Sequence, residues 1–145
     1  MKTLLVLASL FCASMAIAQS FTGLWKGTVT RDYGTETVTD SLLFEISQDG
    51  DKITGFSVLF VRPGEYIRSV IDGSYLQLNQ TLTITETKID YTNIPDRGET
   101  FFLDRYLLIC DANNKEVLTG KCIPNHKKAI YTRSKVTLKK MLPAK

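Results

Sequence analysis

The chain has 145 residues and a formal net charge of +3, and 43% of its residues are hydrophobic, which is enough for one domain with its own core. A charge this small does not indicate a nucleic-acid partner. His126 is the only histidine, so a histidine-based metal cluster is impossible, and we expect neither a metal nor another cofactor. We expect a monomer whose partner is a small molecule or another protein.

Residues 1–18 have the three parts of an export signal. Lys2 supplies a positive charge, residues 4–11 form an apolar run, and Ala-Ile-Ala at residues 16–18 matches a small-x-small cleavage site. The apolar run is shorter than the roughly 20 residues that a membrane-spanning helix needs, and no later run in the sequence reaches that length. We expect cleavage after Ala18, a single domain over residues 19–145, and a secreted or periplasmic protein that does not span the membrane.

The remaining sequence has the two-residue period of β-strands. Val, Ile, Thr, Tyr and Phe fill the apolar runs, and no segment has the sustained three-and-four spacing of a helix. The predicted strands cover residues 21–29, 42–46, 53–61, 66–75, 81–89, 101–110, 116–122 and 129–139. Most connections between them are short, and several contain turn residues, such as Pro63-Gly64.

Eight consecutive strands with short connections predict an all-β, antiparallel, up-and-down meander. Closing such a meander into a barrel protects its edge strands, so we expect a lipocalin-like barrel. A two-sheet β-sandwich is the alternative. The longest connection, residues 90–100, would form a flap at one mouth of the barrel.

The first predicted strand carries a recognisable motif. Residues 21–27 read F-T-G-L-W-K-G, which resembles the G-x-W signature that opens lipocalin-like barrels and, more specifically, small secreted lipocalin-like proteins of Gram-negative bacteria. The hairpin at residues 49–55 and the L-T-G at residues 118–120 are also similar to that family. The resemblance implies that a cation from the last strand packs over Trp25, with Arg133 preferred over Lys135 because its guanidinium is planar.

We predict a structural role for Trp25. On the apolar phase of a first strand, a Trp closes the floor of a barrel, whereas a ligand-stacking Trp would lie near an open mouth. Gly23 and Gly27, which flank it, fit close strand approach or tight curvature. We therefore expect Trp25, Arg133, Gly23 and Gly27 to be structural.

Catalytic motifs are missing from the sequence. It contains neither a Gly-x-Ser-x-Gly elbow nor a phosphate-binding glycine loop. Carboxylates within predicted strands could form a glycosidase pair, and these are Asp40, Glu45, Asp72, Glu86 and Asp104. Alternation places Glu45 opposite Leu42, Phe44 and Ile46, so its side chain should face water. Without a positioned acid and base, we predict that the protein is not an enzyme.

Cys110 and Cys122 remain after removal of the signal, and an oxidising compartment favours a disulfide between them. The register opposes it, because a two-residue turn at Asn113-Asn114 would separate the two cysteines by about five residue pairs, or roughly 16 Å. A disulfide would need a wider loop or a bent strand. The competing interpretation is two separately buried thiols.

Two arginines interrupt apolar phases of predicted strands. Arg68 shares a phase with Tyr66 and Val70, and Arg105 shares one with Leu103 and Leu107. Such arginines need an internal partner, for example Asp72 or Glu86, or the anionic head of a ligand. In the second case Arg68 and Arg105 would bind that head, with Tyr66 and Tyr106 beside it.

The function that the sequence predicts best is non-enzymatic binding of a small apolar or amphipathic ligand. The alternative is an envelope accessory protein, or an inhibitor of a secreted enzyme, that has no internal cavity. A cavity of some hundreds of cubic ångströms would favour the first, and a filled barrel the second.

Overall fold

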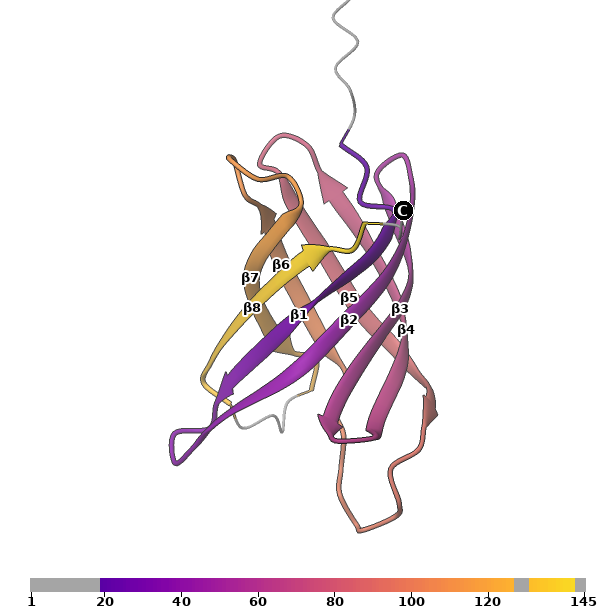
Figure 1. Cartoon of the computed structure of the whole chain (residues 1–145), viewed down its shortest axis with the longest axis vertical. Helices are drawn as coiled ribbons and strands as arrows, with labels where there is room; N and C mark the ends of the chain where they lie inside the picture. The colour runs from indigo at the N-terminus through magenta and orange to yellow at the C-terminus, as the bar shows by residue number, and fades with distance from the viewer. Residues whose placement is uncertain (1–18, 127–130, 143–145) are drawn as a thin grey trace, which may run out of the picture.

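Eight antiparallel strands form the structure, a computed structural model that describes residues 19–126 and 131–142. The strands are β1 (Gly23–Asp32), β2 (Thr37–Asp49), β3 (Lys52–Arg62), β4 (Glu65–Leu76), β5 (Thr81–Thr92), β6 (Asp104–Cys110), β7 (Val117–Pro124) and β8 (Arg133–Lys140). Each strand is hydrogen-bonded to the next, and β1 is also bonded to β8, so the sheet closes into a barrel (Figure 1). The predicted up-and-down barrel is confirmed, and the sandwich alternative is wrong.

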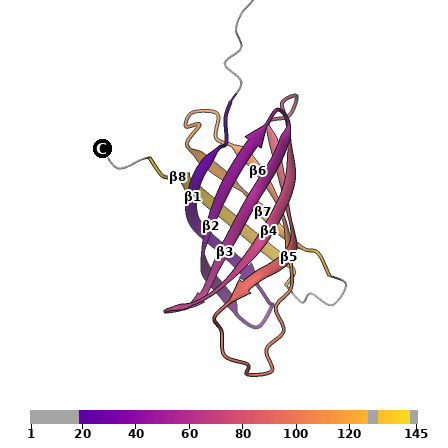
Figure 2. The same ribbon diagram turned by 90° about the vertical axis from the view of Figure 1, so that its right-hand side faces the viewer.

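The strand boundaries differ from the prediction most in β2, which spans Thr37–Asp49 rather than residues 42–46, and they also differ at the longest connection. β5 continues to Thr92 and β6 begins only at Asp104, so the connection covers residues 93–103 and includes Phe101 and Phe102. Figure 2 shows this connection extending beyond one end of the barrel. The predicted export signal lies outside the described residues, as does the predicted start of the last strand at residues 129–130.

Alternation along the strands separates the core from the solvent. In β2, the side chains of Leu42, Phe44 and Ile46 are buried while that of Glu45 is exposed, as its phase predicted. The same alternation in the other strands lines most of the barrel interior with aliphatic and aromatic side chains. Among the described residues there is no helix long and apolar enough to cross a membrane.

An up-and-down meander places alternate connections at opposite ends of the barrel. The N-terminal segment lies at the same end as the connections β2–β3, β4–β5 and β6–β7 (Figure 1). We call this the closed end. The opposite end, which we call the open end, holds the connections β1–β2 and β3–β4, the long connection 93–103, the end of β7 and the start of β8.

Aromatic side chains fill the closed end. Trp25 is fully buried, and its indole Nε1 donates a hydrogen bond to the carbonyl oxygen of Phe21 at 2.7 Å. The Phe21 ring is also buried and lies 4.7 Å from the Tyr75 ring, centroid to centroid. The segment before β1 therefore covers this end of the core with Phe21.

The cation over the Trp25 ring is Lys140, with its Nζ 5.6 Å from the ring centroid. The expected pairing of Trp25 with Arg133 is wrong because of the β1–β8 register. Trp25 lies opposite Lys140, whereas Arg133 lies opposite Asp32 at the other end of β1. Lys140 also donates a hydrogen bond to the carbonyl oxygen of Ser20, so it holds the N-terminal segment against the closed end.

Gly27 allows β1 and β8 to approach each other closely. A methyl group at its Cα would overlap the carbonyl oxygen of Thr137, so only glycine fits without a shift of the backbone. Gly23 begins β1 with a φ of 128°, a value that residues with a Cβ rarely adopt. Both glycines thus shape the first strand where the barrel closes on itself.

Candidate functional site

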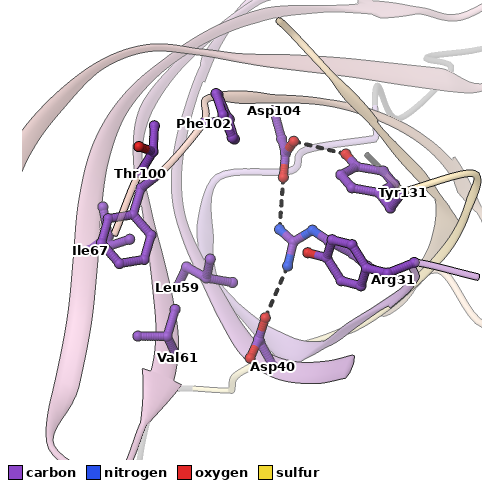
Figure 3. A pocket seen from close by; sticks show the side chains of 11 residues that line it. Arg31, Asp40, Leu59, Val61, Ile67, Thr100, Phe102, Asp104 and Tyr131 are labelled. Carbon is purple, nitrogen blue, oxygen red and sulfur yellow. Dashed lines mark hydrogen bonds and ion pairs between the residues drawn. The ribbon is translucent and has the colours of Figure 1, made fainter. Parts of the chain in front are cut away.

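A buried arginine links three strands at the open end. Arg31 of β1 follows Trp25 and Val29 on the inward phase, and its guanidinium bridges two carboxylates (Figure 3). Its Nη1 lies 3.0 Å from Oδ2 of Asp40, and its Nη2 lies 2.7 Å from Oδ2 of Asp104. These contacts join β1 to β2 and across the interior to β6.

Burial and charge act in opposite directions on these groups. Burial by itself would lower the pKa of Arg31, but the neighbouring Asp104, Tyr106 and Cys122 together more than offset it, so the pKa is raised and the guanidinium stays charged. Burial raises the pKa of Asp40, and its ion pair with Arg31 limits the rise. Asp40 is also the more exposed partner, with 12% of its side-chain surface accessible compared with 6% for Asp104.

Tyr131, just before β8, completes this charged group. Its hydroxyl donates a hydrogen bond of 2.8 Å to Oδ1 of Asp104, and the Arg31 guanidinium lies 5.7 Å from the centroid of its ring. Burial raises the pKa of Tyr131, and the neighbouring Cys122 and Asp104 raise it further, so the phenol keeps its proton. We call Arg31, Asp40, Asp104 and Tyr131 the mouth cluster.

Glu86 lies on the inner side of the mouth cluster. Its carboxylate accepts hydrogen bonds from the Ser57 hydroxyl at 2.6 Å, the backbone amide of Asp104 at 2.9 Å and the Tyr106 hydroxyl at 3.3 Å. Burial raises the pKa of Glu86, although the hydrogen bonds from Ser57 and Asp104 favour its charged form. The Tyr106 ring meets the Phe44 ring edge-on at 5.0 Å, where the polar group gives way to the apolar core.

A cavity of about 250 Å³ opens beside the mouth cluster (Figure 3). Its apolar wall comes from β3, β4 and the connection 93–103, and consists of Leu59, Val61, Ile67, Phe101 and Phe102. Its polar side consists of the mouth cluster, together with Tyr33 and Thr100. The cavity is therefore amphipathic, with charge on one side and aliphatic and aromatic groups on the other.

The connection 93–103 is tied down by a four-charge clasp at its rim. Arg62 binds both carboxylate oxygens of Glu99 and one of Glu65, and Arg97 binds both oxygens of Glu65. The two arginines lower the pKa of Glu65, which therefore stays ionised. These pairs are exposed, so they position the connection without adding much stability.

The structure does not bring the predicted ligand-binding residues together. Tyr66 and Arg68 project from the outer wall of the barrel, where Arg68 pairs with Asp90 and lies over the Phe56 ring at 4.6 Å. Arg105 is also on the outer wall, while Tyr106 is buried inside. The prediction correctly grouped residues that share one face of a strand. It was wrong in placing the face that carries the arginines inside the barrel. In both strands the inward phase is the other one, which includes Ile67 in β4 and Asp104 in β6.

The predicted disulfide is wrong, because Cys110 and Cys122 are both free and buried. Cys110 lies opposite Leu118, and Cys122 lies opposite Tyr106, four residues away along β6. That separation is roughly 13 Å, well beyond disulfide reach. Cys110 accepts a hydrogen bond from Gln19 toward the closed end, whereas Cys122 lies near Tyr131 at the open end.

Sequence reasoning missed Arg31 and Tyr131. Arg31 carried a usable signal, because it has the same phase as Trp25 and Val29 and so had to face the interior. Asp40 and Asp104 were recognised as strand carboxylates, but not as its partners. Tyr131 lies just before β8, outside the alternation of that strand, so no pattern pointed to it.

The fold and the site together define a class: an eight-stranded up-and-down barrel whose core is closed at one end by aromatic side chains and whose other end holds an amphipathic cavity. Within the described parts of the chain, no three His, Cys, Asp or Glu side chains form a group that could hold a metal ion. In comparisons with known proteins, no family model matches the chain, and no curated protein has a significantly similar sequence.

Proposed function

We propose that this protein binds a small amphipathic molecule in the cavity at its open end and does not transform it. The observation that carries the proposal is the cavity of about 250 Å³, with an apolar wall on one side and the mouth cluster on the other. Its size is near the lower end for ligand sites, so the ligand should be small. A filled interior would have favoured the alternative, an interaction module without a cavity.

The mouth cluster favours a ligand head that donates hydrogen bonds. Two carboxylates, Asp40 and Asp104, face the single cation Arg31. Both oxygens of Asp104 accept hydrogen bonds within the cluster, but Oδ1 of Asp40 accepts none from the described residues. An amine or hydroxyl group could bind this oxygen while the rest of the ligand lies against Leu59 and Phe101.

Binding is preferred to catalysis because both oxygens of the Asp104 and Glu86 carboxylates already have hydrogen-bond partners. Arg31 and Tyr131 bind Asp104, and the three donors around Glu86 bind that carboxylate. A general acid or base must instead reach a proton of the substrate. These hydrogen bonds hold the carboxylates in place, so the polar side of the cavity can orient a ligand.

The proposed location is secreted or periplasmic, and the kinship is with lipocalin-like proteins. The location is supported by the signal pattern of residues 1–18, and the kinship by the G-x-W motif together with the barrel and its cation-covered Trp25. N-terminal sequencing of the protein from its source tests the location. A chain that starts at Gln19 is expected, and one that starts at Met1 would contradict it.

The cavity is tested with the fluorophore N-phenyl-1-naphthylamine, an apolar probe with one N–H donor. We expect saturable fluorescence enhancement at one probe per chain. In Leu59→Trp the larger ring occupies the cavity and should abolish the enhancement. The matched control is Val58→Trp, because the neighbouring side chain of β3 projects from the outer wall.

Thermal melts of both variants establish that each is folded. Loss of enhancement in Leu59→Trp but not in Val58→Trp supports the site. Unchanged enhancement in a folded Leu59→Trp would overturn the proposal. Native mass spectrometry of protein purified from its source can then identify a retained ligand.

A further inference from the structure

One outer face of the barrel carries an excess of positive charge. The strands β6, β7, β8 and β1 are neighbours around the wall (Figure 1). Their outward positions hold six cations. They are Lys26, Arg105, Lys121, Arg133, Lys135 and Lys139. Among the outward positions of these strands, the only acidic residue is Asp32, at the end of β1. We call these strands' outer surface the basic face.

The strand register brings the cations of this face close together. Lys26 lies opposite Lys139 across the β1–β8 pair, so two like charges are direct neighbours. Such a pair is destabilising unless an anion lies nearby. The arrangement therefore points to an external partner of negative charge.

The arginines outside the basic face differ from the cations on it in their ion pairs. Arg31, Arg62, Arg68 and Arg97, which lie elsewhere, each form an ion pair. Arg105 and Arg133 form no ion pair with any described residue, nor do the four lysines of the basic face. Their charge is thus available to a partner.

A groove in the basic face provides a place for one anionic group. The β7–β8 register ends at the pair Gly120 and Val136, and beyond it the Ser134 hydroxyl bonds to both the amide and the carbonyl of Cys122. The resulting space, about 410 Å³, opens on the outside between the strands and has Lys121 and Arg133 in its lining. A groove with one cation on each side suits a phosphate group.

Exposed aliphatic side chains accompany the cations. Ile109 of β6 and Ile123 of β7 are 53% and 37% exposed, and Leu24 of β1 is 44% exposed. Met141, which follows β8 and bonds to the backbone of Leu24, is 49% exposed. Aliphatic groups gain nothing from a soluble polyanion, but they can enter the boundary between head groups and acyl chains of a membrane.

We propose that the basic face docks on a membrane surface rich in anionic phospholipid, with a lipid phosphate in the groove between Lys121 and Arg133. This surface lies on the outer wall, whereas the cavity opens at the end of the barrel, and among the described residues their linings share only Tyr131, so the proposal goes beyond the proposed ligand binding. Basic side chains close to such a surface attract anionic lipid, and the aliphatic side chains add apolar burial. The attraction acts within about one Debye length and is weakened by salt.

The test is co-sedimentation of the protein, produced from the full chain, with vesicles of phosphatidylcholine alone or mixed with phosphatidylglycerol. We expect binding only to the mixed vesicles, and release when NaCl is raised from about 0.1 M to about 1 M. The triple variant Lys121→Glu/Arg133→Glu/Lys135→Glu should lower the partition coefficient at least roughly tenfold. Lys52→Glu/Lys88→Glu is the control, because it reverses exposed charges in β3 and β5, away from the basic face.

A second variant separates lipid from a soluble polyanion. Ile109→Ser/Ile123→Ser should weaken vesicle binding but leave binding to heparin unchanged, and it preserves every cation. Thermal melts establish that the variants are folded. Three outcomes would overturn the proposal: equal binding to both kinds of vesicle, equal loss in the control and the triple variant, or heparin binding without vesicle binding.

Discussion

The two ends of the barrel are built from the same strands, but their interiors differ in chemistry and packing. At the closed end, Phe21, Trp25 and Tyr75 fill the space between the strands with aromatic rings, and Lys140 covers the outside. At the open end, the inward positions carry Arg31 and Asp104, and a cavity remains beside them. One end therefore excludes water by packing, and the other keeps buried charges paired around a space.

β1 by itself shows how this difference arises. Trp25, Val29 and Arg31 share one face of the strand, and all three are buried. Trp25 gains stability from the apolar surface that it buries, roughly 25 cal/mol per Å². Arg31 loses hydration on burial and depends on Asp40 and Asp104 to offset that loss. Alternation decides which side chains face inward. The chemistry of each inward side chain decides whether that part of the interior is an apolar packed core or a polar site.

Removing the aromatic plug should have the largest effect on this comparison. Trp25→Ala is expected to lower the free energy of unfolding by roughly 3–5 kcal/mol, because it leaves a large void and removes the Nε1 hydrogen bond to Phe21. Urea denaturation followed by far-UV circular dichroism measures the change. Leu24→Ala is the control, since the neighbouring side chain is outward and partly exposed. Equal losses in the two variants would contradict a plug at Trp25.

Removing the buried cation should have the next largest effect. Arg31→Met leaves Asp104 buried without its cation, and we expect a loss of roughly 3 kcal/mol in the free energy of unfolding. Arg62→Met is the control, because Arg62 also binds two carboxylates but lies in solvent, where ion pairs contribute little. Chemical denaturation should resolve the first change far more easily than the second. A loss in Arg62→Met as large as that in Arg31→Met would show that burial does not matter here.

A smaller effect should appear as a pH dependence at Glu86. Burial raises the pKa of this carboxyl in the folded state, so the folded chain keeps a proton that the unfolded chain releases near pH 4.5. The stability linked to this proton is fully present below that pH and is lost as the pH rises through the folded pKa. Relative to Glu86→Gln, the natural chain should therefore become more stable as the pH falls from neutral toward 4.5. Denaturation of both proteins across this range measures the difference, and a constant difference would contradict a raised pKa.

The sequence was most informative where local periodicity carries the information. Eight strands, their up-and-down order and the outward side chain of Glu45 followed from alternation and turn residues. The sequence was least informative about which phase faces inward when both phases carry apolar residues. In β4, Tyr66 and Val70 alternate with Ile67 and Ile71, so apolar content by itself did not show that Arg68 lies outside.

The sequence by itself thus determined the class of fold and the number and order of its strands, because these depend on neighbours along the chain. Tertiary structure decided which residues meet across the barrel, because register and closure bring together strands that are distant in sequence. Closure of β1 on β8 placed Lys140 rather than Arg133 over Trp25, and the β6–β7 register kept Cys110 and Cys122 apart. Closure also placed Asp104 beside Arg31, 73 residues away in the chain, and so created the polar edge of the cavity. No local pattern encodes such a contact, because its energy exists only once both strands are part of the same closed wall.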